Sequence, residues 1–168
     1  MMRIIGWWLF LILGFYLCSI LTLIPIPADY QWFRPQWLLL FVLFCQIYHP
    51  SQFSLVIAWT VGLCLDALLG VQLGLHAFLF SFICYVASVL NPPFMQRSLL
   101  QQMGRILLLV ALAQISLFVF HTFDGQNPRT LWYWMGSVTS FLVWPMFVIF
   151  LKGISLLLPV APSPSRSI

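Results

Sequence analysis

The sequence contains very little charge, with three acidic side chains and no glutamate. Of its 168 residues, 6% are charged and 62% are hydrophobic, and the mean hydropathy is +1.03. In soluble domains roughly a quarter of all residues are charged, so this composition excludes a water-soluble globular protein. In so apolar a chain, the net charge of +4 is explained by membrane topology signals and not by nucleic-acid binding. The composition therefore predicts an integral membrane protein.

The residue clusters that carry out catalysis or bind metals are also missing. The sequence has no GxSG or HExxH motif, no carboxylate cluster and one acid inside an apolar run. The cysteines lie in separate apolar runs, where a single thiol behaves as a small hydrophobe: Cys18, Cys45, Cys64 and Cys84. The histidines, at predicted helix ends, are typical of polar boundaries: His49, His76 and His121. We expect no enzyme activity, no metal and no cofactor.

Six apolar segments predict an all-α bundle of six transmembrane helices in one domain, residues 1–158. They cover about 4–24, 35–48, 52–69, 73–90, 104–121 and 130–151. The first is too long for a secretory signal and lacks a small-residue exit, so we expect it to be retained. Proline pairs and polar side chains in "NPPFMQRSLLQQMGR" predict a break before the fifth helix, with parts lying along the surface. The Pro- and Ser-rich tail 159–168 is expected to be disordered.

The distribution of basic residues predicts which side of the membrane holds the termini. Six helices place both ends on one side, and cytoplasmic loops carry an excess of Lys and Arg. An inside N-terminus puts Arg3, Arg97, Arg105, Lys152 and Arg166 in the cytoplasm and leaves Arg34 and Arg129 outside. This excess predicts that the N- and C-termini are both cytoplasmic.

The segment "GLCLDALLGVQLG" at 62–74 places the lone intramembrane acid, Asp66, on a face of small residues. Gly62 and Gly70 stand four residues before and after it, and Gly74 continues the spacing, so another helix could approach closely there. An ionised Asp in mid-membrane costs about 2.5 to 3.5 kcal/mol on insertion scales, so it should be paired, protonated or capping. Partners near the outer end are Arg34, His76 and Arg129.

Arg34 is the first choice for that pair, because its guanidinium satisfies a carboxylate bidentately. The pair would fasten the bundle; a ligand or proton site and a partner contact are the other interpretations of Asp66. On the last helix, Trp144-Pro145 predicts a kink, which either shapes the helix or forms a groove for a partner.

Three motifs in this order resemble the rod shape-determining MreD family of bacterial membrane proteins. They are "FRPQW" at 33–37 (Phe33, Arg34, Pro35 and Trp37), the segment around Asp66, and "WP" at 144–145. The similarity spans roughly residues 25–152. It implies a multi-pass subunit of the inner membrane, not known for catalysis, with a fold similar to the S components of energy-coupling factor transporters.

The resemblance also implies partners. They are the transmembrane helix of MreC and, through MreC, MreB, the SEDS polymerase and a penicillin-binding transpeptidase, in addition to membrane lipid. A scaffold for lateral peptidoglycan synthesis and rod shape is therefore expected, with the MreC contact on a small-residue or kinked face. The alternative is a solute-binding component of a vitamin-type transporter, with a pocket near Arg34, Asp66 and His76.

Overall fold

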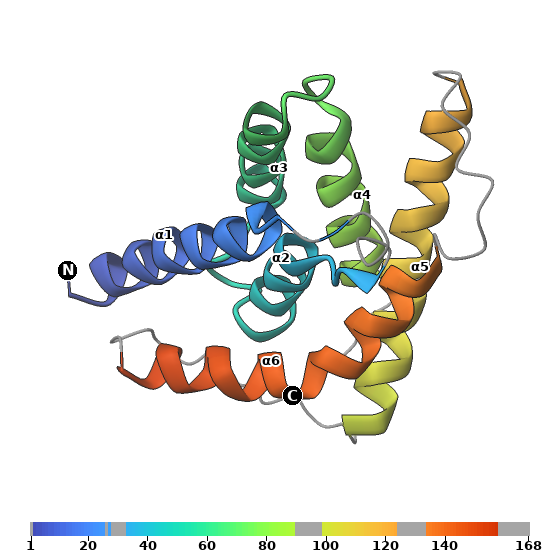
Figure 1. The fold of residues 1–168 in the computed structure, drawn as a ribbon. Helices are drawn as coiled ribbons and strands as arrows, with labels where there is room; N and C mark the ends of the chain where they lie inside the picture. The colour runs from blue at the N-terminus through green and yellow to red at the C-terminus, as the bar shows by residue number, and fades with distance from the viewer. Residues whose placement is uncertain (1, 26, 28–32, 90–98, 124–133, 158–168) are drawn as a thin grey trace.

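The described parts of the chain fold into α-helices (Figure 1). The computed structural model describes residues 2–25, 27, 33–89, 99–123 and 134–157, and within these ranges there are six helices and no strand. The helices are α1 (Met2–Leu23), α2 (Trp37–Tyr48), α3 (Leu55–Leu69), α4 (Leu75–Val89), α5 (Leu99–Phe123) and α6 (Met135–Leu157). The prediction of an all-α membrane bundle with six helices is confirmed.

The fifth helix begins earlier, and the sixth helix ends later, than predicted. Helix α5 begins at Leu99 and not at about 104, so residues 99–103 are helical and do not belong to the predicted break. The paired prolines of that break lie outside the described residues. Leu, Gln and Met are good helix formers, and the polar Gln102 is buried, where it accepts a hydrogen bond of 2.9 Å from the hydroxyl of Tyr48. Helix α6 continues past 151 to Leu157. The predicted disordered tail lies outside the described residues.

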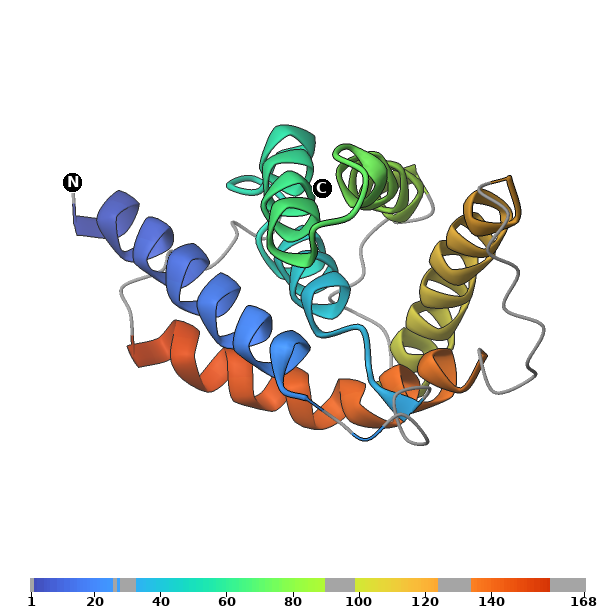
Figure 2. The same cartoon turned by 45° about the horizontal axis from the view of Figure 1, so that its top comes forward.

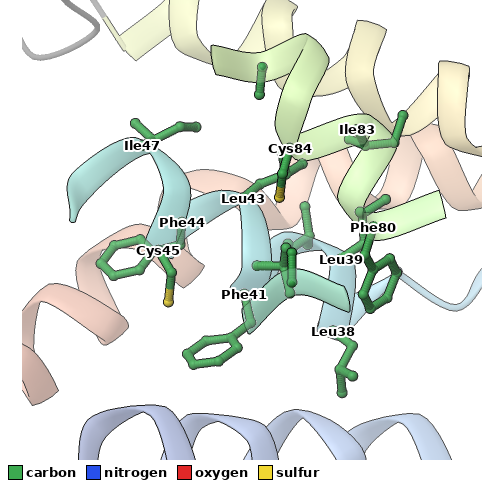
Figure 3. Close-up of a cluster of buried hydrophobic side chains, with 14 of the residues drawn as sticks. Leu38, Leu39, Phe41, Leu43, Phe44, Cys45, Ile47, Phe80, Ile83 and Cys84 are labelled. Carbon is green, nitrogen blue, oxygen red and sulfur yellow. The ribbon is translucent and has the colours of Figure 1, made fainter. Parts of the chain in front are cut away.

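Helix α2 forms the centre of the bundle. Every residue from Leu38 to Cys45 is at most 2% exposed, as expected for a helix that is apolar on all sides. It packs against α1, α4 and α6. In Figure 3, Phe41 points towards α1 while Leu43 lies beside Cys84 of α4.

Close approach of α1 to α2 depends on a glycine. A β-carbon on Gly14 would lie 2.2 Å from a ring carbon of Phe41, so only hydrogen fits there. The neighbouring ring of Phe10 also packs on Phe41, with the ring centroids 5.9 Å apart. In a membrane, such packing replaces exclusion from water as the force that holds helices together.

The outer faces of the helices are apolar, as a lipid environment requires. Three helices contain stretches long and apolar enough to cross a membrane: Ile5–Leu23, Leu100–Phe123 and Met135–Leu157. The helices α2, α3 and α4 are shorter, with 12, 15 and 15 residues. Figures 1 and 2 show the first turn of α1 and the last turn of α6 on the same side of the molecule.

Candidate functional site

Asp66 lies in the last turn of α3 and is completely buried, with 0% of its surface exposed. Helix α3 starts at the N-cap Ser54, whose hydroxyl accepts from the amide of Ile57, and ends at Gly70. Gly70 adopts a φ of 64°, a left-handed conformation that favours glycine, and its amide donates to the Asp66 carbonyl. The amide of Val71 donates to the same carbonyl at 3.2 Å. The backbone of Asp66 therefore closes α3.

The side chain of Asp66 caps the next helix in the chain. Its carboxylate accepts hydrogen bonds from the amides of Gly74 at 2.9 Å and His76 at 3.0 Å, and the amide of Ala77 lies at 3.5 Å. The first amides of a helix have no partner within the helix, and they form its positive end. A carboxylate from the last turn of α3 therefore satisfies the start of α4.

His76 completes this arrangement with its side chain. Its Nδ1 lies 2.7 Å from Oδ1 of Asp66, and the imidazole is 16% exposed. A carboxylate only accepts hydrogen bonds, so Nδ1 carries the hydrogen and donates it. The ring meets Phe80 edge-on, with the centroids 6.0 Å apart, which orients it further. We call Asp66, Gly74 and His76 the hairpin clamp.

Arg34 does not pair with Asp66, so the predicted ion pair is wrong. Its guanidinium donates to the carbonyls of Thr22 and Ile24 at the C-terminal end of α1. Carbonyls at a helix end lack helical partners and attract a cation, so Arg34 is the cap of α1. The acid that it was expected to hold is satisfied locally by its own hairpin.

The rest of the "FRPQW" motif joins the start of α2 to α6. The amide of Gln36 donates to the hydroxyl of Ser140 at 3.1 Å, and Ser140 is buried. The ring of Trp37 packs on Phe147, with centroids 6.0 Å apart. Pro35 is half-buried, and Phe33 is 39% exposed. The motif therefore connects three helices, and its arginine is one of the connecting groups.

The glycines predicted on a contact face have two different roles. A β-carbon on Gly62 would lie 2.4 Å from the Cα of Ala77 and 2.5 Å from the carbonyl oxygen of His76, so this glycine lets α4 touch α3. Gly70 and Gly74 have positive φ values of 64° and 102° and shape the turn. The small-residue face therefore serves a contact within the chain.

The predicted kink residues lie within α6. Helix α6 continues through Pro145 and changes direction along its length (Figures 1 and 2). Proline has no amide hydrogen and removes one helical hydrogen bond, which accounts for a bend. Trp144 is 1% exposed and faces the core, so its side chain is not on an outer surface.

Two further polar contacts were not predicted from the sequence. Ser137 of α6 donates to the side-chain oxygen of Gln114 on α5, and both residues are buried. At the other end of the bundle, the ammonium of Lys152 lies 4.4 Å from the ring centroid of Tyr48, which also donates to Gln102. Gln114, a lone glutamine within an apolar run, was the available signal for the first contact, because a polar group inside a membrane requires a partner.

The geometry of the hairpin clamp suits a structural role in joining α3 to α4. The Asp66 carboxylate is engaged with amides and an imidazole, and its burial keeps it away from any substrate in solvent. Within the ranges that the structure describes, no three His, Cys, Asp or Glu side chains gather in a group that could hold a metal ion. The site joins two helices and closes their turn.

Comparisons with known proteins identify the family. The family model for rod shape-determining protein MreD matches residues 2–154. A curated relative, the rod shape-determining protein MreD of Haemophilus influenzae, is 26% identical over 155 residues, which cover 90% of this chain and 94% of that protein. No solved structure matches. Since the family model matches nearly the whole chain, the protein belongs to the MreD family of membrane proteins that determine rod shape.

Proposed function

We propose that this protein is a non-enzymatic, multi-pass scaffold of the bacterial inner membrane that binds the transmembrane helix of MreC. Through MreC it would connect to MreB, the SEDS polymerase and the penicillin-binding transpeptidase, and so support lateral peptidoglycan synthesis. Family membership supports the shape role, and the apolar helices support the membrane location. The position of α1's start and α6's end on one side of the molecule agrees with two cytoplasmic termini.

A scaffold role is supported by how the polar side chains are used. Asp66 accepts a hydrogen bond from His76, Arg34 donates to a carbonyl at the end of α1, and Ser137 donates to Gln114. Each contact joins parts of the bundle to one another. Such a protein acts on its partners through its lipid-facing surface, where another membrane helix can pack.

The outer face of α6 is the surface that we propose for the MreC helix. Its exposed side chains follow one stripe: Leu142, Met146, Ile149, Phe150 and Leu156. Gly153 lies in this stripe with nothing within 4 Å of a β-carbon built on it, which leaves a notch between large side chains. Small residues at helix interfaces let two backbones approach closely. The bend at Pro145 would add a shape that selects one partner helix.

Site-specific photocrosslinking in cells tests this contact. A photoreactive residue at Ile149 on α6 should capture MreC, whereas the same residue at Phe78 on α4 should not; both side chains are 71% exposed. Equal capture from both positions, or undiminished capture of an MreC with a scrambled transmembrane sequence, would sink the proposal.

A matched pair of glycine substitutions tests the notch. Gly153→Leu should abolish MreC co-purification, while Gly104→Leu on α5 should not, although both glycines have open space around them. Normal co-purification with Gly153→Leu would place the MreC contact elsewhere on the bundle.

The solute-binding alternative has no support from the geometry. Its pocket required Arg34, Asp66 and His76 to converge on one ligand. Arg34 donates instead to carbonyls of α1, and Asp66 accepts from α4. Only the scaffold is therefore proposed.

A further inference from the structure

The α3–α4 hairpin is too short to cross a bilayer. Each of its helices has 15 residues, which at 1.5 Å per residue reach about 22 Å. The hydrocarbon core is about 30 Å thick. By contrast, α1, α5 and α6 have 22, 25 and 23 residues and reach far enough. Helix α2 is shorter still, with 12 residues, but other helices enclose it from Leu38 to Cys45, so it does not meet lipid along its length. The hairpin has exposed side chains on both helices, and its length makes it stop short of the surface opposite the one where it starts.

The turn of this hairpin carries no charge and has large exposed apolar side chains. The connection from Gly70 to Gly74 reads "GVQLG", and the exposed side chains around it are the polar Gln72 and the apolar Leu69, Val71 and Leu73, the last at 72%. The other two connections on this side differ in sequence: the segment before α2 carries Asp29 and Arg34, and the segment before α6 carries Asp124 and Arg129. The turn therefore lacks the charged side chains that the other two connections carry, and leucine and valine make up most of its exposed side chains.

Five amides in and beside the turn find partners within the hairpin itself. Two amides after α3, those of Gly70 and Val71, donate to the Asp66 carbonyl. The amides of Gly74 and His76 donate to the Asp66 carboxylate, and the amide of Leu75 donates to the Gln72 carbonyl. Irregular backbone within hydrocarbon is tolerated only when such groups find partners in the protein. Asp66 supplies both sets of partners.

We infer that the α3–α4 hairpin is a re-entrant element whose turn ends inside the bilayer, in the half opposite the chain termini. Leu69, Val71 and Leu73 contact lipid acyl chains there, and the buried Asp66 carboxylate keeps the turn in this position. Figure 1 shows the turn at the tip of the hairpin, apart from α1, α2 and α6, so those helices leave it open to lipid. This inference does not depend on MreC binding.

Spin labelling of the full-length protein in phospholipid vesicles tests the location of the turn. A nitroxide is placed at Leu73→Cys in a Cys64→Ala background, which removes the exposed native thiol; the other cysteines are buried. Collision rates with oxygen, which concentrates in lipid, and with a water-soluble nickel chelate are then measured. The aqueous reference is the free nitroxide in buffer, and a lipid reference is Ile149→Cys, whose native side chain is 71% exposed.

The inference requires high oxygen and low nickel collision rates at position 73, equal to those at position 149. Nickel accessibility close to that of the free nitroxide in buffer would place the turn in water and overturn the inference. Low accessibility to both reagents would mean that protein covers the turn, which also overturns it.

The role of Asp66 is tested with the same label. Asp66→Asn should raise the nickel collision rate at position 73 at least twofold, because the amide replaces one acceptor with a donor and the turn loses a partner. An unchanged rate in a folded Asp66→Asn protein would show that the carboxylate does not hold the turn in lipid. The Leu73→Cys result with native Asp66 stands independently of how this variant folds.

Discussion

The Nδ1 of His76 lies 2.7 Å from Oδ1 of Asp66, and this contact joins the first turn of α4 to the last turn of α3. The two residues are ten positions apart, across a turn shaped by two glycines of positive φ. The same carboxylate also accepts from the amides of Gly74 and His76. One acidic residue therefore fixes the end of α3 through its backbone carbonyl and the start of α4 through its side chain.

Replacing Asp66 should destabilise the protein strongly. Asp66→Ala leaves the amides at the start of α4 without an acceptor, and we expect a loss on the order of 3 kcal/mol in unfolding free energy. Asp66→Asn should lose less, because its amide oxygen still accepts. Thermal unfolding in detergent measures both, with Thr60→Ala on the exposed side of α3 as control. A wild-type melting temperature for Asp66→Ala would refute the clamp.

The two candidate partners of Asp66 can be separated by double-mutant cycles. The pair Asp66→Asn and His76→Gln should show a coupling of about 0.5 to 3 kcal/mol, because the side chains are in contact. The pair Asp66→Asn and Arg34→Lys should be additive within about 0.5 kcal/mol, since Arg34 donates to α1. Unfolding free energies in a mild detergent provide the measurement. Strong coupling to Arg34 would restore the predicted ion pair.

The α3–α4 contact should not tolerate a methyl group at Gly62. The added carbon would lie 2.4 Å from the Cα of Ala77, and backbone cannot move aside as a flexible side chain does. We expect Gly62→Ala to destabilise by about 1 to 3 kcal/mol. Gly104→Ala is the matched control in open space and should stabilise slightly, by about 0.5 to 1 kcal/mol. Equal melting temperatures of the two variants would contradict the close approach.

The stability of the protein should fall in mild acid because of His49, which follows the last residue of α2. Burial lowers the pKa of the His49 imidazole below its usual 6.5, and the rings of Trp7 and Phe44 lie 5.2 Å and 6.1 Å away. The unfolded chain therefore binds a proton first as the pH falls, so protonation favours unfolding. Stability should be unaffected by His49 well above pH 6.5 and should decrease below it.

The measurement is the melting temperature of the wild type and of His49→Phe between pH 8 and pH 5. Both proteins contain His76 and His121, so the difference between their melting temperatures reports on His49 alone. The wild type should lose more stability than the variant over this interval. Parallel curves would show that His49 does not titrate between the folded and unfolded states.

Local sequence patterns predicted the elements better than the contacts between them. The position of Asp66 on the third helix and the kink-forming proline within the sixth were read directly from the chain, because hydropathy and proline chemistry act locally. The start of α5 was missed because the polar residues in "LLQQMGR" were interpreted as facing water. Gln102 is instead buried and bonded to Tyr48, a partner 54 residues earlier in the sequence.

The partner of Asp66 shows where such reasoning stops. Arg34 and His76 were both available near the outer helix ends, and the better geometry of a guanidinium favoured Arg34. Two carbonyls at the end of α1 already occupy that guanidinium, and the tight turn after Gly70 brings α4 back onto the carboxylate. Which basic side chain pairs with Asp66 depends on distances in the folded protein, and these cannot be read from the spacing of residues along the chain.

The sequence by itself determined that this protein is an apolar bundle of six helices with a single buried acid, because composition and segment hydropathy decide whether water or lipid surrounds a helix. It also carried the ordered motifs by which the family is recognised. Only the tertiary structure decided that Asp66 caps α4, that Arg34 caps α1 and that Gly62 serves an internal contact. Each of these depends on which helix ends and turns lie close together in space. Helix-terminal amides and carbonyls without helical partners form hydrogen bonds with the charged side chain that the fold brings nearest.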